Sequence, residues 1–136
     1  MIHSEVKLAY MAGIIDGEGS VMLSHSSNPK YRAPIVSVSS TSYEILNWIK
    51  TNFGGHICSH KTYNEKHKSH WSWRLSNNVC IEILSLILPY MVEATKIYRA
   101  SHIVNNYKKV TKRNGQYSEK EKLDKLDFED QFYLKP

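Results

Sequence analysis

MAGIIDGEGS, residues 11–20, is the stretch that decides the fold. Upstream of it, Val6, Tyr10 and Ile14 recur at the spacing of one helix face, which predicts a helix over residues 5–15. The glycines of the stretch favour leaving the helical conformation, so we expect the helix to end within residues 16–19. Two carboxylates, Asp16 and Glu18, are thereby placed together at a helix terminus.

Downstream, alternation of polar and apolar residues predicts strands, and wider apolar stripes predict further helices. The order is α, β, β, α, β, β, α, then more helices. We expect one α+β domain with a four-stranded antiparallel curved sheet, helices on one of its faces, and C-terminal helices. Capping boxes are expected at Thr41 with Glu44 and at Ser118 with Glu121. Strands are expected at 20–26, 33–39, 56–62 and 69–76, and helices from the Ser40-Thr41-Ser42 cap to about Phe53 and at 79–88, 92–110 and 118–132.

The predicted sheet has one apolar and one polar face. Trp71, Trp73 and Leu75 alternate with polar residues in the fourth strand, so we expect them in the core. The opposite face carries hydrogen-bond donors and few negative charges, which suits a DNA major groove. A solvated sheet face is the alternative. The predicted residues of this open face are Met22, Ser24, Ser26, Ser37, His56, Cys58, His60, His70, Ser72 and Arg74.

The composition is that of an ordinary globular chain with a modest basic excess. Among 136 residues, 18 Lys and Arg against 13 Asp and Glu give a net charge of +5, which favours a polyanionic partner such as nucleic acid. Two cysteines, Cys58 and Cys80, are too few for a disulfide scaffold and indicate reduced thiols. We see no secretory or transit signal and no apolar run near the roughly 20 residues of a membrane span. The expectation is an intracellular protein, in phage-infected bacterial cytoplasm or in an organelle.

Residues 11–19 resemble, over nine consecutive positions, the motif of the LAGLIDADG family of homing endonucleases. The resemblance extends to the predicted element order and covers about residues 5–107, with 108–136 as a basic linker and C-terminal helix. It implies metal-dependent, site-specific double-strand cleavage of DNA, encoded in an intron, an intein or a free-standing gene. One motif per chain implies a homodimer and a pseudo-palindromic site. The partner-facing residues implied are Ala9, Ala12, Gly13 and Asp16, and Ser20 joins the open-face residues as a DNA contact.

The resemblance also assigns chemical roles. Glu18 matches the metal-binding acid, and the main-chain carbonyl of Gly17 is a second expected ligand. Carboxylate and carbonyl oxygens suit Mg²⁺, for which Mn²⁺ could substitute. Asp16 is expected to serve a structural hydrogen bond. Ser40, or its neighbour Ser39, matches the residue that orders water, and Lys96 is expected to stabilise charge on the phosphate.

Other interpretations remain open from the sequence. His56, Cys58 and His60, with His67 and His70 nearby, could bind zinc, although the glycines of a zinc knuckle are missing. The basic residues Lys108, Lys109, Lys112 and Arg113 could contact phosphates or be solvated. The main alternative function is a cleavage-deficient DNA-binding regulator or RNA-splicing maturase of the same fold. An enzyme with an accidental motif and a protein-interaction domain are more distant alternatives.

Overall fold

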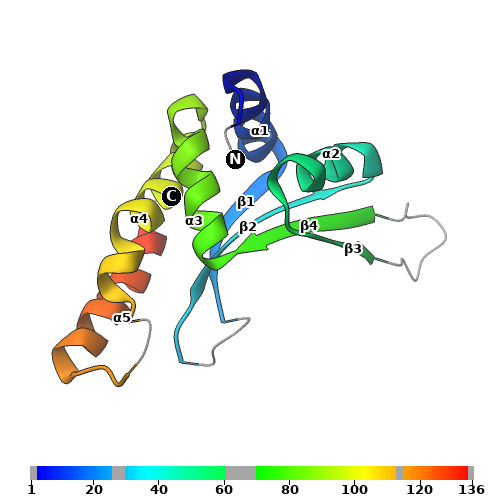
Figure 1. Ribbon diagram of the computed structural model, residues 1–136. Coiled ribbons are helices and arrows are strands. Elements are labelled where there is room, and N and C mark those ends of the chain that lie inside the picture. The colour runs from blue at the N-terminus through cyan, green and yellow to red at the C-terminus, as the bar shows by residue number, and fades with distance from the viewer. Residues whose placement is uncertain (1–2, 26–29, 61–69, 113–114, 135–136) are drawn as a thin grey trace.

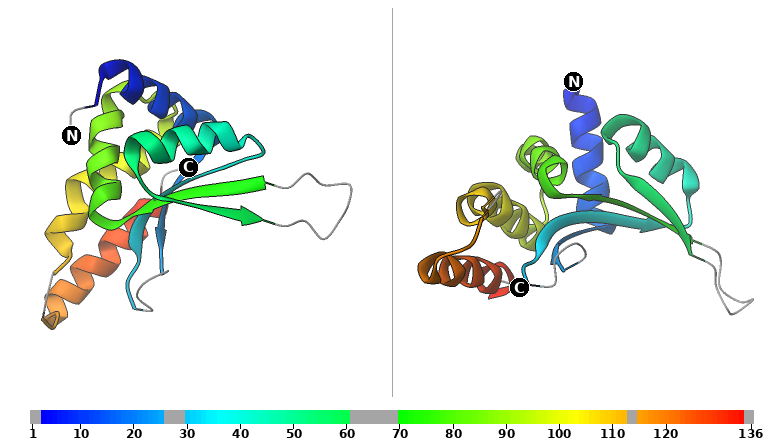
Figure 2. Two further views of the ribbon diagram at one scale, coloured as in Figure 1. Left: turned by 45° about the vertical axis from the view of Figure 1, so that its right-hand side comes forward. Right: turned by 60° about the horizontal axis from the view of Figure 1, so that its bottom comes forward.

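A computed structural model describes residues 3–25, 30–60, 70–112 and 115–134. Four strands form one antiparallel sheet in the order β1-β2-β4-β3, and the sequence predicted a four-stranded antiparallel sheet. Helices cover one face of the curved sheet and leave the other open (Figures 1 and 2). The elements are α1 (Glu5–Glu18), β1 (Gly19–Ser24), β2 (Ala33–Ser40), α2 (Tyr43–Phe53), β3 (His56–His60), β4 (His70–Ser76), α3 (Asn77–Ile87), the 3₁₀ turn η1 (Leu88–Tyr90), α4 (Ala94–Val110) and α5 (Glu119–Leu134).

The helix α1 is longer than its apolar pattern suggested. The pattern predicted a helix over residues 5–15, yet α1 continues through Gly17 to Glu18. Gly19 ends it, and its N–H donates to the Ile15 carbonyl. A Cβ at Gly19 would lie 2.7 Å from the Ile15 Cα, so only glycine permits this close passage into β1.

The core lies between the covered face of the sheet and the helices. Trp73 is fully buried at its centre and Trp71 is partly buried, which confirms their predicted core positions. The Trp73 Nε1–H donates to the Gly54 carbonyl at 2.7 Å. Gly55 has φ +97°, and a Cβ there would lie 2.5 Å from the Trp73 Nε1, so the turn before β3 requires glycine.

The helix starts were predicted with mixed success. At α5 the Ser118 and Glu121 capping box forms, with hydrogen bonds of 3.0 and 3.1 Å in the two directions. The box expected at Thr41 is wrong, because the N-cap position of α2 is Ser42, whose side chain caps no N–H and instead donates its Oγ–H to Glu44. None of the described helices has the length and apolar run required to cross a bilayer.

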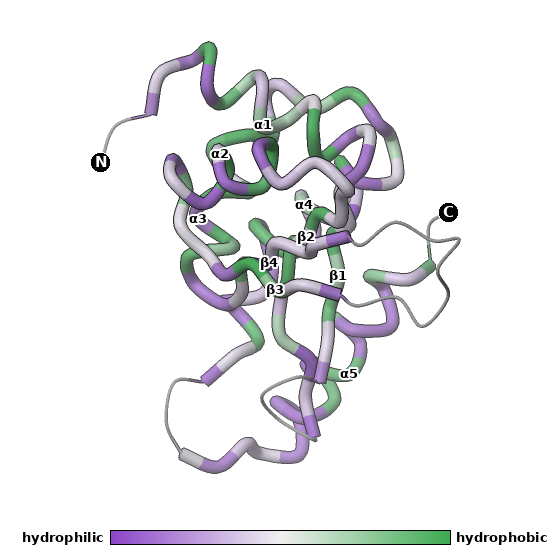
Figure 3. Tube along the Cα trace, turned by 90° about the vertical axis from the view of Figure 1, so that its right-hand side faces the viewer, coloured by the Kyte–Doolittle hydropathy of each residue, from purple (hydrophilic) through white to green (hydrophobic). Residues whose placement is uncertain are grey.

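Hydropathy differs between the sheet and the C-terminal helix. Figure 3 shows green stretches within β1 and β2, whereas purple predominates along α5. The helix α5 nevertheless buries Phe128 and Phe132 against α4, where Ala100 and Ile103 are also buried. The C-terminal segment therefore belongs to the same core as the sheet.

Candidate catalytic centre and nucleic-acid interface

Glu18 lies where α1 meets β1. The residue is exposed, and within the described part of the chain its carboxylate has no hydrogen bond or ion pair. The β1–β2 pairing ends at Gly19 and Val38, so Glu18 lies at the end of the sheet where Ser39 follows Val38 in β2. A solvated carboxylate at the end of the sheet, with none of its oxygens used internally, is free to accept an external cation.

Asp16, two residues earlier, uses both of its carboxylate oxygens in hydrogen bonds within the chain. Its Oδ2 accepts from the Val92 N–H at 2.9 Å and its Oδ1 from the Glu93 N–H at 3.2 Å. These bonds tie the end of α1 to the start of α4. They agree with the expected structural role, and they turn the carboxylate toward its own chain rather than toward a partner.

Lys96 lies against the C-terminal end of α1. Its Nζ donates to the carbonyls of Ile15 at 3.0 Å and Asp16 at 2.7 Å, two acceptors at the C-terminal end of α1. The last carbonyls of a helix lack intrahelical donors and carry partial negative charge, which an ammonium group stabilises. Lys96 thus caps α1 directly before Gly17 and Glu18, and its expected role in stabilising charge on the phosphate stays a prediction.

Glu93 was missed from the sequence. It is the N-cap of α4, and its carboxylate accepts from the N–H groups of Thr95 at 3.2 Å and Lys96 at 2.8 Å. The hydrogen bond from the Lys96 N–H, and after it the one from the Thr95 N–H, lower the pKa of the Glu93 carboxyl below its ordinary value of 4.5. Because Ser, Thr, Asp and Asn are the usual N-caps, nothing in the local pattern marked this residue.

The two serines that could order water, Ser39 and Ser40, have different surroundings. The Ser40 Oγ accepts from the Ser42 N–H at 2.9 Å, so it serves the turn into α2. Ser39 is exposed, and its Oγ lies 2.9 Å from the Ser72 Oγ on the open face. Ser39 therefore has its hydroxyl on the open face, while the choice of Ser39 or Ser40 as the water-ordering residue stays a prediction.

Cross-strand pairing assembles the predicted open-face residues into rows. Ser20, Ser37, Arg74 and His56 form one row across all four strands. Directly opposite side chains on one face of a sheet are about 4.5–5.5 Å apart, so each row is a continuous surface. In the direction of the β3–β4 connection, the next row holds Ser39, Ser72 and Cys58, and the row after it holds His70 and His60. In the direction of the β1–β2 turn, the next row holds Met22, Ile35 and Ser76, and the row after it holds Ser24 and Ala33. Ser26 lies outside the described residues.

A hydrogen-bonded chain crosses three strands of this face. The His60 Nε2 lies 2.8 Å from the Ser72 Oγ, which in turn contacts Ser39. The rings of His60 and His70 stack with centroids 4.8 Å apart. These side chains hold one another in place before any ligand binds. Toward the turn between β1 and β2 this face is covered rather than open, since Ile35 is only 1% exposed and Ala33 only 7%.

The partner-facing assignment of Ala12 is wrong. Ala12 is completely buried in the core of its own chain and has no surface to offer. The outer side of α1 instead exposes Val6 at 79% and Tyr10 at 52%, together with Ala9 and Gly13. This outward stripe extends to Gly17.

The described residues contain no group of three His, Cys, Asp or Glu that could hold a metal ion. The zinc interpretation therefore has no support from His56, Cys58, His60 and His70, and His67 lies outside the described residues. Cys58 is an exposed free thiol and Cys80 a buried one, as expected. Burial raises the pKa of the Cys80 thiol to about 12.

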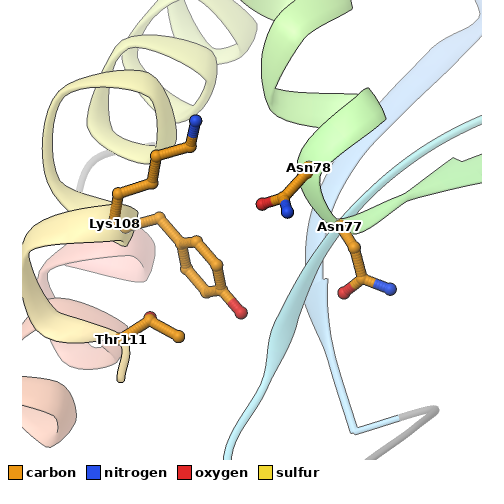
Figure 4. Close-up of a pocket in the computed structure, with 5 residues that line it drawn as sticks. Asn77, Asn78, Lys108 and Thr111 are labelled. Atoms are coloured by element: carbon orange, nitrogen blue, oxygen red, sulfur yellow. The ribbon is translucent and has the colours of Figure 1, made fainter. Parts of the chain in front are cut away.

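Only some of the basic residues at 108–113 have side chains that are free to contact a phosphate. Lys108 is exposed beside a hollow of about 500 Å³ between the start of α3 and the end of α4, lined also by Asn77, Asn78, Tyr107 and Thr111 (Figure 4). Lys112 instead pairs with Glu121 at 2.9 Å, and this ion pair lowers the pKa of Glu121 to about 2. Arg113 lies outside the described residues.

Comparison with known proteins agrees with this geometry. A family model described as LAGLIDADG endonuclease matches residues 11–107. A structure of the homing endonuclease I-CvuI in complex with its target is similar with a TM-score of 0.66 and 17% identity, over 95% of this chain and 81% of that one. The homing endonuclease I-TnaI is similar with a TM-score of 0.65 and 12% identity, over 98% and 92% of the two chains.

An archaeal intron-encoded homing endonuclease, I-Vdi141I, in complex with DNA is similar with a TM-score of 0.51 and 18% identity, over 98% and 100% of the chains. No curated protein sequence is similar enough to count as a match. At these identities the solved structures establish the fold, while the family model covers most of the chain, including Glu18 and Lys96. The chain belongs to the LAGLIDADG endonuclease family.

Proposed function

We propose that this protein is a site-specific DNA endonuclease that cuts both strands of a pseudo-palindromic site as a homodimer, using divalent metal. The observation that carries the proposal is the position of Glu18. It is an exposed carboxylate without an internal partner among the described residues, at the end of a helix whose outer side is apolar and beside an open, donor-rich sheet face.

The donors near Glu18 fit a hard cation. The Glu18 carboxylate and the Gly17 carbonyl are oxygen ligands of the kind that Mg²⁺ and Mn²⁺ accept, with room left for water and a phosphate oxygen. Such a cation, when bound, supplies positive charge to the phosphate and lowers the pKa of the attacking water. Lys96 and Asp16 fix the end of α1, so Gly17 and Glu18 are held on a rigid support.

The outer side of α1 supports the homodimer. The helix buries Leu8, Met11 and Ile15 inward, yet Val6 and Tyr10 are exposed on the other side. An apolar stripe on the outer side of a helix is normally covered by another element. A second copy packed on this stripe about a two-fold axis would cover it and bring two Glu18 residues together.

The open face supports recognition of double-stranded DNA. Its rows present serine hydroxyls, imidazoles and the exposed Arg74, which can contact base edges in a major groove. Each subunit would cover roughly 10 bp, about one helical turn, so the full site would be near twice that length. The solved I-CvuI and I-Vdi141I structures are themselves DNA complexes.

The test is cleavage of a plasmid library that carries randomised sites, with and without Mg²⁺. The wild type should yield linear products from sites with two-fold symmetry, and only with metal. Glu18→Gln should abolish cleavage and keep DNA binding, whereas Glu82→Gln, at an exposed acid on α3, should cut normally. Binding without cleavage by the wild type would refute the nuclease and favour the cleavage-deficient regulator.

A further inference from the structure

The helix α5 contacts the β1–β2 hairpin, meaning the paired strands β1 and β2, near its turn. The Tyr133 hydroxyl donates to the carbonyl of Leu23 in β1 at 3.0 Å. The same hydroxyl accepts from the Arg32 Nη1, just before β2, at 3.1 Å. One phenol therefore bonds both strand ends across the turn, and the right-hand view of Figure 2 shows the end of α5 beside β2.

The sequence of the hairpin creates the need for this contact. The residue opposite Leu23 in the register is Pro34, which has no N–H to donate. Since β1 is also an edge strand, no further strand lies beyond it in the described sheet. A Leu23 carbonyl that faces β2 meets no N–H at Pro34, and one that faces the edge meets no further strand in the described sheet. In either orientation Tyr133 supplies the donor that the sheet does not.

Further contacts hold the same region. The Arg32 Nε lies 3.6 Å from the Glu129 Oε1 of α5, and Glu129 is only 8% exposed. Lys125, which is 1% exposed, places its Nζ 4.4 Å from the centre of the Tyr107 ring and 5.7 Å from that of Tyr31. The Glu129 Oε1 has the Arg32 guanidinium as its partner, whereas its Oε2 is buried without a hydrogen bond among the described residues. Arg32 thus links the start of β2 to α5 through both Tyr133 and Glu129.

We propose that α5 is a brace that sets the position of the β1–β2 hairpin on DNA, with Tyr133 as a positioning residue for sequence discrimination. The hairpin carries Met22 and Ser24 on the open face, and they flank Leu23 directly. Ser24 is five residues beyond Gly19, roughly 17 Å along the strand from the Glu18 junction. The brace thus acts at the end of β1 opposite the Glu18 junction, and its role in discrimination rests on the proposed function.

The first experiment needs no DNA. Tyr133→Phe in the full chain should make hydrogen exchange of the amides of residues 22–24, 31–33 and 35–36 about fivefold faster, the factor for one ordinary hydrogen bond. The matched control is Tyr98→Phe, which deletes a phenol-to-carbonyl bond of 2.7 Å from α4 to Gln131 of α5. Equal changes in both variants, or none in Tyr133→Phe, would overturn the brace.

The second experiment compares cleavage profiles on a randomised site. Tyr133→Phe should lose about fivefold in discrimination at base pairs some five steps or more from the cut, with central preferences and metal dependence unchanged. Tyr98→Phe should keep the wild-type profile. A uniform loss across the site would overturn the positioning role. If the wild type neither binds nor cuts DNA, the proposed function and the discrimination role fail together, while hydrogen exchange still decides the brace.

Discussion

Gly13→Ala should stabilise the fold of one chain and weaken its association with a second. A Cβ built at Gly13 meets nothing within 4 Å, so the chain itself has room for the methyl group. Replacing a helix-interior glycine by alanine gains about 1 kcal/mol through helix propensity. If two copies of α1 pack closely, two added methyl groups should cost about 1–3 kcal/mol of association free energy, as overpacking does elsewhere.

The expected dimer dissociation constant is therefore roughly 10- to 100-fold higher than that of the wild type. Sedimentation velocity over a range of concentrations measures it, and urea unfolding at low concentration measures the stability of the chain. Gly13→Arg should give a monomer with intact helical circular dichroism, while Asn47→Arg on the exposed side of α2 leaves the association unchanged. An unaltered dimer in Gly13→Arg would refute packing through this face.

Lys96→Met should lower the unfolding free energy by about 1.5–3 kcal/mol in urea titrations, because two helix-end carbonyls lose a charged donor; an unchanged midpoint would contradict the cap. Because the folded pKa of Glu121 is depressed from 4.5 to about 2, its stabilising effect is complete above pH 4.5 and is lost as the pH falls toward 2. The stability difference between wild type and Glu121→Gln should follow that window, and a difference independent of pH would refute the ion pair with Lys112. Arg74→Ala should weaken specific DNA binding by about 1–3 kcal/mol in titrations at fixed salt, with a chain as stable as the wild type.

Local patterns were sufficient to predict the sheet. Alternation in residues 70–76 placed Trp73 inward and Arg74 outward, because neighbouring side chains of a strand point to opposite faces. The motif at residues 11–19 located the helix terminus and the exposed acid, since glycine and carboxylate positions carry their own conformational and chemical signals.

The supporting contacts of the site could not be predicted, because they join residues far apart in the sequence. The Lys96 Nζ reaches the Asp16 carbonyl across 80 positions, and the Glu93 N–H reaches the Asp16 carboxylate across 77. These contacts also explain why α1 runs past Gly17, since they stabilise its last turn from outside. Tertiary hydrogen bonds thus outweighed the local preference of glycine for leaving a helix.

The number of chains on one cleavable duplex tests the central claim most directly. Sedimentation of the wild type with its selected duplex and Mg²⁺ should show two chains per DNA molecule, and the complex should go on to yield double-strand breaks. One chain per duplex, still able to cut both strands, would contradict an active centre made from paired Glu18 residues.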